Sequence, residues 1–123
     1  MFARMTILEL KPETIENAIR LFRTSVIPEA RKQEGYGGAC FLIDRTQGKG
    51  KAVTFWNCER DALANEANLY YQEQLIKFLS MFAAPPSREG YEVVVHEIGT
   101  VIKKRPRTPA QAAKPKAKPK RGR

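Results

Sequence analysis

One tryptophan and two adjacent tyrosines are the residues of this sequence best suited to hold an organic molecule. Trp56 ends a β-favouring run, where an indole can stack on an aromatic ligand and donate one hydrogen bond. The alternative is that Trp56 fills the interface between a sheet and its helices. Tyr70 and Tyr71 are neighbours in a helical stretch, so their side chains point about 100° apart. We therefore expect that they cannot both face one pocket and that one of them is structural.

His96 is the single histidine of the chain. A neutral imidazole can accept a proton near physiological pH, and the alternative is a hydrogen-bonded packing residue. A zinc site would have too few ligands, and any Ser/His/Asp set would have to use His96. Cys40 and Cys58 form no CxxC motif, and they fit small buried hydrophobes better than nucleophiles. We expect neither a metal nor a cofactor, and the sequence does not identify which residues would be catalytic.

The charge of the chain is concentrated in its last part. The sequence has 22 Lys and Arg residues against 13 Asp and Glu residues, a formal net charge of +9. Cations of a flexible arm bind the phosphates of nucleic acid without reading base sequence, whereas the alternative is a solubilising extension. Ten cations lie in this arm, with no acid among them: Lys103, Lys104, Arg105, Arg107, Lys114, Lys116, Lys118, Lys120, Arg121 and Arg123.

The length and the composition predict one folded domain over residues 1–100 and a disordered tail over residues 101–123. The tail consists mainly of Ala, Pro, Lys and Arg, so it cannot bury enough apolar surface to offset the entropy of ordering it. The start of the chain lacks the pattern of a secretory signal, and no apolar run approaches the ~20 residues that span a bilayer. We expect a cytoplasmic protein without a membrane span.

The first half of the domain predicts a strand followed by a helix. Residues 2–10 are rich in apolar and β-favouring types. We expect the helix that follows to kink at Pro28 and to end at Gly35. Its apolar stripe repeats at steps of three and four residues: Ile15, Ile19, Phe22, Val26 and Ala30.

The second half predicts a hairpin, a helix and a last strand. Residues 37–44 and 51–56 form the hairpin, and a helix runs from about residue 58 to 82, with a break near residues 65–68. We expect the prolines at 85 and 86 to stop this helix. The last strand covers residues 91–98, where three successive valines indicate burial on both faces.

This βαββαβ order is typical of an α+β ferredoxin-like fold with an antiparallel sheet. Two helices cover only one face of such a sheet. An apolar face left open would need a partner sheet, so we expect the protein to pair with a copy of itself.

Several segments in this order resemble the antibiotic biosynthesis monooxygenase-like family of dimeric α/β barrels. The resemblance covers about residues 2–98 and does not extend to the tail. Its features are Ile27-Pro28 late in the first helix, residues 34–38 entering a strand, Asp44 before the hairpin, and residues 53–56 leading into a helix with Glu59, Arg60 and Asp61.

The resemblance implies a homodimer with a ligand pocket between sheet and helices in each subunit. Some members of the family oxidise polycyclic aromatics without a cofactor, and others degrade haem. Haem degradation is disfavoured because the position ten residues after Trp56, where those members have histidine, is Glu66. We therefore expect a small apolar or aromatic ligand, positioned by Trp56 and by Tyr70 or Tyr71 and packed against Phe22. The cofactor-independent members imply that such a ligand is oxidised by molecular oxygen. The alternative is a non-enzymatic dimer that binds nucleic acid through its basic tails.

Overall fold

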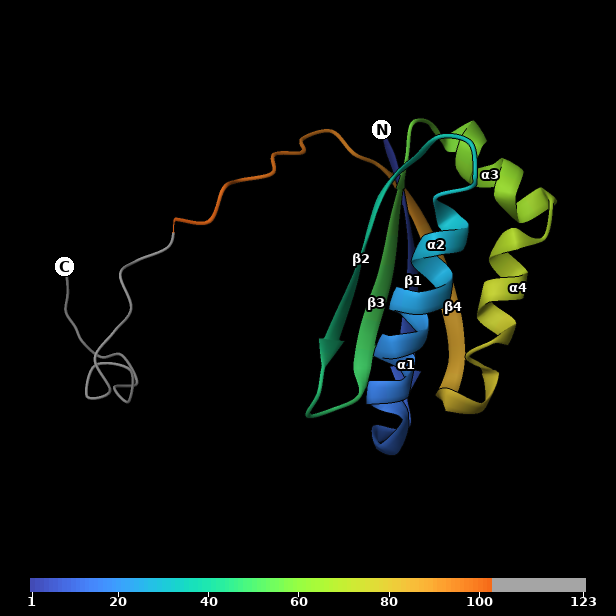
Figure 1. Ribbon diagram of the computed structural model, residues 1–123, viewed down its shortest axis with the longest axis vertical. Coiled ribbons are helices and arrows are strands. Elements are labelled where there is room, and N and C mark those ends of the chain that lie inside the picture. Colours follow the sequence, from blue (N-terminus) through green and yellow to red (C-terminus); the bar gives the residue numbers. More distant parts are fainter. Residues whose placement is uncertain (103–123) are drawn as a thin grey trace.

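The computed structural model describes residues 1–102, which form one sheet with its helices on one side (Figure 1). The strands are β1 (Phe2–Leu10), β2 (Tyr36–Asp44), β3 (Lys49–Trp56) and β4 (Phe82–Glu92). Their order in the sheet is β2-β3-β1-β4, and all neighbouring strands are antiparallel. This arrangement confirms the α+β ferredoxin-like fold that the sequence predicts.

One continuous helical stretch connects β1 to β2. It consists of the 3-10 turn η1 (Pro12–Thr14), α1 (Ile15–Leu21), the π-helical turn η2 (Phe22–Val26) and α2 (Ile27–Ala30). Pro28 has no N–H to offer to the carbonyl four residues before it, and the wider turn η2 lies directly ahead of it. The irregularity expected at this proline is therefore present as a π-helical turn.

The second helical region contains α3 (Glu59–Ala67) and α4 (Tyr70–Ile76). Leu69 joins them in the left-handed conformation, with φ at 71°. A 3-10 turn, η3 (Leu79–Met81), then leads directly into β4. The break expected near residues 65–68 is thus close to its observed place, but the helix ends well before residue 82.

The last strand is not where the sequence predicts it. It covers Phe82–Glu92, and residues 93–102 form no regular element. Pro85 and Pro86 lie inside this strand, at the register shift where Ala84 is opposite Glu9 and Ser87 is opposite Ile7. Because β4 is an edge strand with a bulge, it tolerates prolines that cannot donate ladder hydrogen bonds.

The expected burial of the three valines is also wrong for the described chain. Val94 and Val95 are 80% and 84% exposed. The segment leaves the sheet beside the start of β1, where the Val93 amide donates to the Met1 carbonyl at 2.8 Å (Figure 1).

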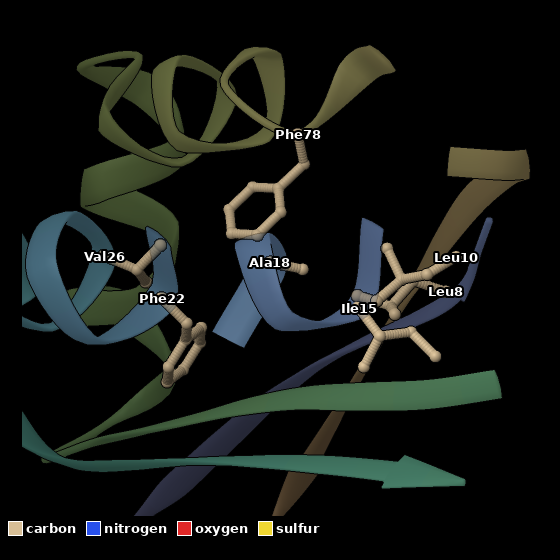
Figure 2. Packing of buried hydrophobic residues seen from close by; sticks show 7 residues of the cluster. All are labelled: Leu8, Leu10, Ile15, Ala18, Phe22, Val26 and Phe78. Atoms are coloured by element: carbon tan, nitrogen blue, oxygen red, sulfur yellow. The ribbon is translucent and has the colours of Figure 1, made fainter. Parts of the chain in front are cut away.

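The main core lies between α1, η2 and one end of the sheet. Figure 2 shows Phe22 pointing from the helical stretch toward the strands, with Phe78 reaching in from the segment after α4. Leu10 is 1% exposed and Ala18 is fully buried. The cluster consists of Leu8, Leu10, Ile15, Ala18, Phe22, Val26 and Phe78.

The face of the sheet opposite the helices has an apolar centre with charged residues such as Lys51 and Glu89 beside it. Strand alternation places Met5 and Ile7 of β1 on this face, with Val53 and Phe55 of β3 beside them. Leu42 of β2 is also on this face and is 51% exposed. No helix of residues 1–102 lies over this side of the sheet (Figure 1).

Candidate functional site

A small cavity lies between the covered face of the sheet and the helices η2 and α4. Its volume is about 50 Å³. Its apolar walls come from Leu8, Phe22, Val26, Phe41, Ala52, Leu75, Phe78 and Phe82. Its polar lining consists of Arg4, Thr6, Thr54, Tyr70, Tyr71 and Gln74. An apolar cavity with a few polar groups at one end is the usual form of a small-molecule site.

Arg4 is the charged residue of this lining. It is only 3% exposed, and its Nη1 donates to the Ala62 carbonyl at 3.0 Å and to Glu66 Oε2 at 3.2 Å. The centre of the guanidinium lies 4.3 Å from the Tyr71 ring and 5.3 Å from the Trp56 ring. Burial lowers the pKa of Arg4, while the hydrogen bond and the charge of Glu66 act in the opposite direction. An arginine stays charged in proteins, so a positive charge lies at this end of the cavity.

Glu66 links Arg4 to a second arginine. Its Oε1 accepts a hydrogen bond from Arg88, which belongs to β4 and is 49% exposed. The guanidinium of Arg88 also lies 6.0 Å from the ring of Tyr71. The aromatic ring of Tyr71 is therefore in contact with two cations, one buried and one at the surface.

Tyr71 is held by a hydroxyl pair with Thr6, whose Oγ1 lies 2.7 Å from the Tyr71 hydroxyl. Burial raises the pKa of Tyr71, although the bond to Thr6 and the charge of Arg4 lower it in part. The hydroxyl is thus neutral at physiological pH and can both donate and accept.

Tyr70 lines the same cavity and also anchors the helices. Its hydroxyl donates to the Val26 carbonyl at 3.1 Å, and burial raises its pKa to about 12. The expectation that Tyr70 and Tyr71 cannot share a pocket is wrong, because α4 lies across the cavity and both rings reach it from adjacent positions. A separation of about 100° excludes two side chains only when the pocket lies to one side of the helix.

Phe22 lies in the wall of the cavity, stacked on Phe41 with ring centres 4.9 Å apart. Trp56 does not line this cavity. It is fully buried, and its Nε1 donates to Thr54 Oγ1 at 2.9 Å. The ring of Trp56 instead lies beside the guanidinium of Arg4, so Arg4 stands between the tryptophan and the cavity.

His96 lies on the opposite side of the sheet. It follows β4 in an irregular segment, and its ring stacks on Phe55 with centres 5.2 Å apart. Phe55 alternates with Thr54 and Trp56 along β3, so it faces away from the helices. The placement of His96 in the last strand was wrong, and this histidine does not reach the cavity of its own chain.

A shallow depression of about 300 Å³ adjoins the cavity at the surface. Tyr71 and Leu75 line both spaces, and Pro86, Ser87 and Arg88 complete the depression. These two side chains of α4 therefore form the partition between the interior and the surface.

Arg4, Thr6, Glu66 and Arg88 were missed as site residues. One signal was available in the sequence, because Arg4 and Thr6 alternate with Leu8 and Leu10 and must share a face with them. The sequence does not reveal that the helices cover this face, because alternation along a strand does not tell which side of the sheet is covered.

The ten cations proposed for nucleic acid, from Lys103 to Arg123, lie outside the described residues. Within residues 1–102, no group of three or more His, Cys, Asp or Glu side chains is arranged to hold a metal ion. The helices of this part of the chain are also too short or too polar to cross a membrane.

Comparison with solved structures identifies the same fold in several antibiotic biosynthesis monooxygenases. A Streptomyces coelicolor monooxygenase, solved with the ligand nanaomycin D, is 16% identical, with a TM-score of 0.64, 80% of this chain covered and 92% of the other. A Nitrosomonas europaea protein provisionally assigned as an antibiotic biosynthesis monooxygenase has a TM-score of 0.64 at 14% identity, covering 77% of this chain and 100% of its own.

A protein of unknown function from Nitrosomonas europaea is similar at 19% identity, with a TM-score of 0.59 and coverage of 81% of this chain and 95% of the other. No family model matches the chain, and no curated protein matches its sequence. The resemblance found in the sequence is therefore confirmed by structure: the chain has the fold of the antibiotic biosynthesis monooxygenase family.

Proposed function

We propose that this protein binds a small apolar or aromatic molecule in the cavity between sheet and helices, and that it oxidises this molecule with molecular oxygen. The observation that supports the proposal is the cavity itself, with apolar walls and one polar end. A neighbour of the same fold was solved in complex with nanaomycin D, which supports the binding of an organic ligand by this fold.

The volume of the cavity sets a condition on this proposal. At about 50 Å³, it is smaller than the roughly 150 Å³ cavity that accommodates a benzene ring. Tyr71 and Leu75 separate the cavity from the surface depression, and turning these side chains would join the two spaces. A ring-sized ligand therefore requires α4 or its side chains to move outward.

The oxygenation needs no added reductant if the ligand is a hydroxyarene. Conversion of 1-naphthol and O2 to a naphthoquinone and water balances all atoms, and the substrate supplies the electrons. The chain would contribute a dry apolar wall and a polar end at which the developing oxyanion is stabilised.

Oxygen uptake with 1-naphthol tests this proposal, with a matched pair of variants. Ala52→Leu fills the cavity, whereas Ala64→Leu adds the same atoms on the exposed side of α3. We expect uptake above the buffer rate in the wild type and in Ala64→Leu, and its loss in Ala52→Leu. No uptake by any of the three, or equal uptake by both variants, would overturn the proposed oxygenation in this cavity.

We also propose a homodimer in the cytoplasm, as the sequence predicts. The apolar centre of the open face supports pairing. A hollow of about 500 Å³ also lies there, lined by apolar residues such as Ile7 and Leu42 and by the charged residues Glu9, Asp44, Lys49 and Lys51. Leu42 on this face and Leu63 on α3 are each 51% exposed, so they form a matched pair.

Native mass spectrometry of the full chain tests the pairing and also detects any bound small molecule. We expect a dimer that Leu42→Lys dissociates and Leu63→Lys leaves intact. A monomeric wild type would contradict the dimer without affecting the cavity.

A further inference from the structure

Arg4 has hydrogen-bonding capacity that residues 1–102 leave unused. Its guanidinium has five N–H donors, and both bonds that it makes in the described chain come from Nη1. The Nε and Nη2 donors have no partner among these residues, although the side chain is only 3% exposed. The buried side-chain atom left without a partner in residues 1–102 is Asn65 Oδ1, so the free donors of Arg4 keep some access to the space around them and are open to an acceptor from a ligand.

The free donors share one edge of the guanidinium. Nε–H and one N–H of Nη2 point in parallel from that edge, which matches the two oxygens of a carboxylate. The rings of Tyr71 and Trp56 also lie near the guanidinium, with their centres 4.3 Å and 5.3 Å from its central carbon. These rings offer no strong acceptor to the Nε and Nη2 donors, which therefore remain available to a ligand.

The charges around the cavity also favour an anion. Arg4 lines the cavity and Arg88 lines the adjoining depression, whereas no Asp or Glu lines either space. Glu66 pairs with both arginines and so compensates only one of the two positive charges. One negative charge on a ligand would balance the group.

We propose that the ligand of this cavity is a monocarboxylate with an apolar or aromatic body, bound by the Nε and Nη2 edge of Arg4. The inference rests on the proposed ligand cavity and adds the charge and the polar group of the ligand. The cavity of about 50 Å³ has room for several waters and hence for a carboxylate group. The body of the ligand would extend between Tyr71 and Leu75 toward the depression.

The single tryptophan provides the readout, because Trp56 lies beside Arg4. The full chain is titrated with benzoate, benzamide and phenol, and binding is measured by Trp56 fluorescence and by calorimetry. The three probes share a benzene ring, so differences in affinity report the effect of the charge and of the polar group. We expect benzoate to bind about 10- to 100-fold more tightly than benzamide, since a charge-assisted pair replaces a neutral contact. Phenol, neutral at pH 7, should bind no better than benzamide.

Three variants assign this preference to Arg4. Arg4→Met should remove the preference for benzoate over benzamide, and Arg4→Lys should keep only part of it because lysine lacks the two parallel N–H donors of arginine. Arg45→Met is the matched control, since Arg45 also pairs with one glutamate but is 62% exposed on the surface. It should bind all three probes like the wild type.

The outcomes separate this inference from the proposed function. Equal binding of benzoate and benzamide by the wild type would overturn the carboxylate and leave the cavity in place. Tighter binding of phenol than of benzoate would also overturn it, in favour of a phenolic ligand. Binding of none of the three probes would overturn both. The wild-type comparison decides the question even if Arg4→Met fails to fold.

Discussion

The two ends of the helix-covered face of the sheet are built differently. At one end Leu8 and Leu10 of β1 pack against α1 and η2 in an apolar core. At the other end Arg4 and Thr6 of the same strand are just as buried but contact charged and polar groups of α3 and α4. One strand, with the same alternation throughout, thus supports an apolar core and a polar cluster.

This difference indicates that the apolar end contributes most to the stability of the fold and that the polar end contributes little. Burying a leucine stabilises the fold by about 1.5–3 kcal/mol. A buried ion pair gives little net stability, because removing the charges from water offsets their attraction. A polar cluster retained beside the cavity is therefore better explained by binding than by folding, and three measurements can test this distinction.

Truncating the apolar end should have the largest effect. Leu10 is 1% exposed, and Leu10→Ala should lower the free energy of unfolding by about 4 kcal/mol through lost burial and a residual cavity. Urea denaturation followed by circular dichroism measures the change. Leu79→Ala is the control, since Leu79 is 62% exposed and should change stability by no more than about 0.5 kcal/mol. A small effect of Leu10→Ala would mean that this end does not stabilise the fold.

The ion pair of the polar end should be costly to break but not to replace. Glu66→Met leaves Arg4 buried without its carboxylate and should cost about 3 kcal/mol. The double variant Arg4→Met with Glu66→Met should return to within about 1 kcal/mol of the wild type, because no uncompensated buried charge remains. Urea denaturation of the wild type, the two single variants and the double variant measures the coupling. If the double variant were less stable than Glu66→Met, the polar end would be a structural element and the comparison would fail.

The smallest effect should appear only at high pH. Burial raises the pKa of Tyr70 from 10.0 to about 12 in the folded chain. The stability that comes from keeping the Tyr70 hydroxyl neutral is fully present below pH 10 and is lost as the pH rises toward 12, by roughly 2–3 kcal/mol. Tyr70→Phe should therefore lose less stability than the wild type over this range, as measured by urea denaturation at a series of pH values. Tyr91→Phe is the control, because the hydrogen bond to Glu89 raises the pKa of Tyr91 at an exposed position where solvent screens the interaction, and its dependence should stay close to that of the wild type.

The fold was predictable because its signals are local and repeated. The apolar stripe from Ile15 to Ala30 and the two runs of the hairpin match the observed helices and strands closely. The error at the last strand has a specific cause. Pro85 and Pro86 were interpreted as the end of a helix, whereas an edge strand with a bulge can hold both. The valines at 93–95 suggested a buried strand, but that reading depends on neighbours that sequence does not specify.

The candidate site was predictable only in part. Phe22, Tyr70 and Tyr71 were selected as candidates and lie in the lining of the cavity. Trp56 and His96 were selected for their chemistry, yet one is buried behind Arg4 and the other lies on the far side of the sheet. Side-chain type indicates what a residue could do, whereas its access to a ligand depends on which face the chain covers.

The sequence by itself determined the order of strands and helices and the alternation along β1, because these follow from residue spacing. Only the tertiary structure decided that Arg4 and Thr6 face the helices. That choice depends on α3 and α4, which supply the Ala62 carbonyl, Glu66 and the Tyr71 hydroxyl more than fifty residues later in the chain. A buried cation is tolerable only when such distant partners surround it, and no pattern within β1 contains them.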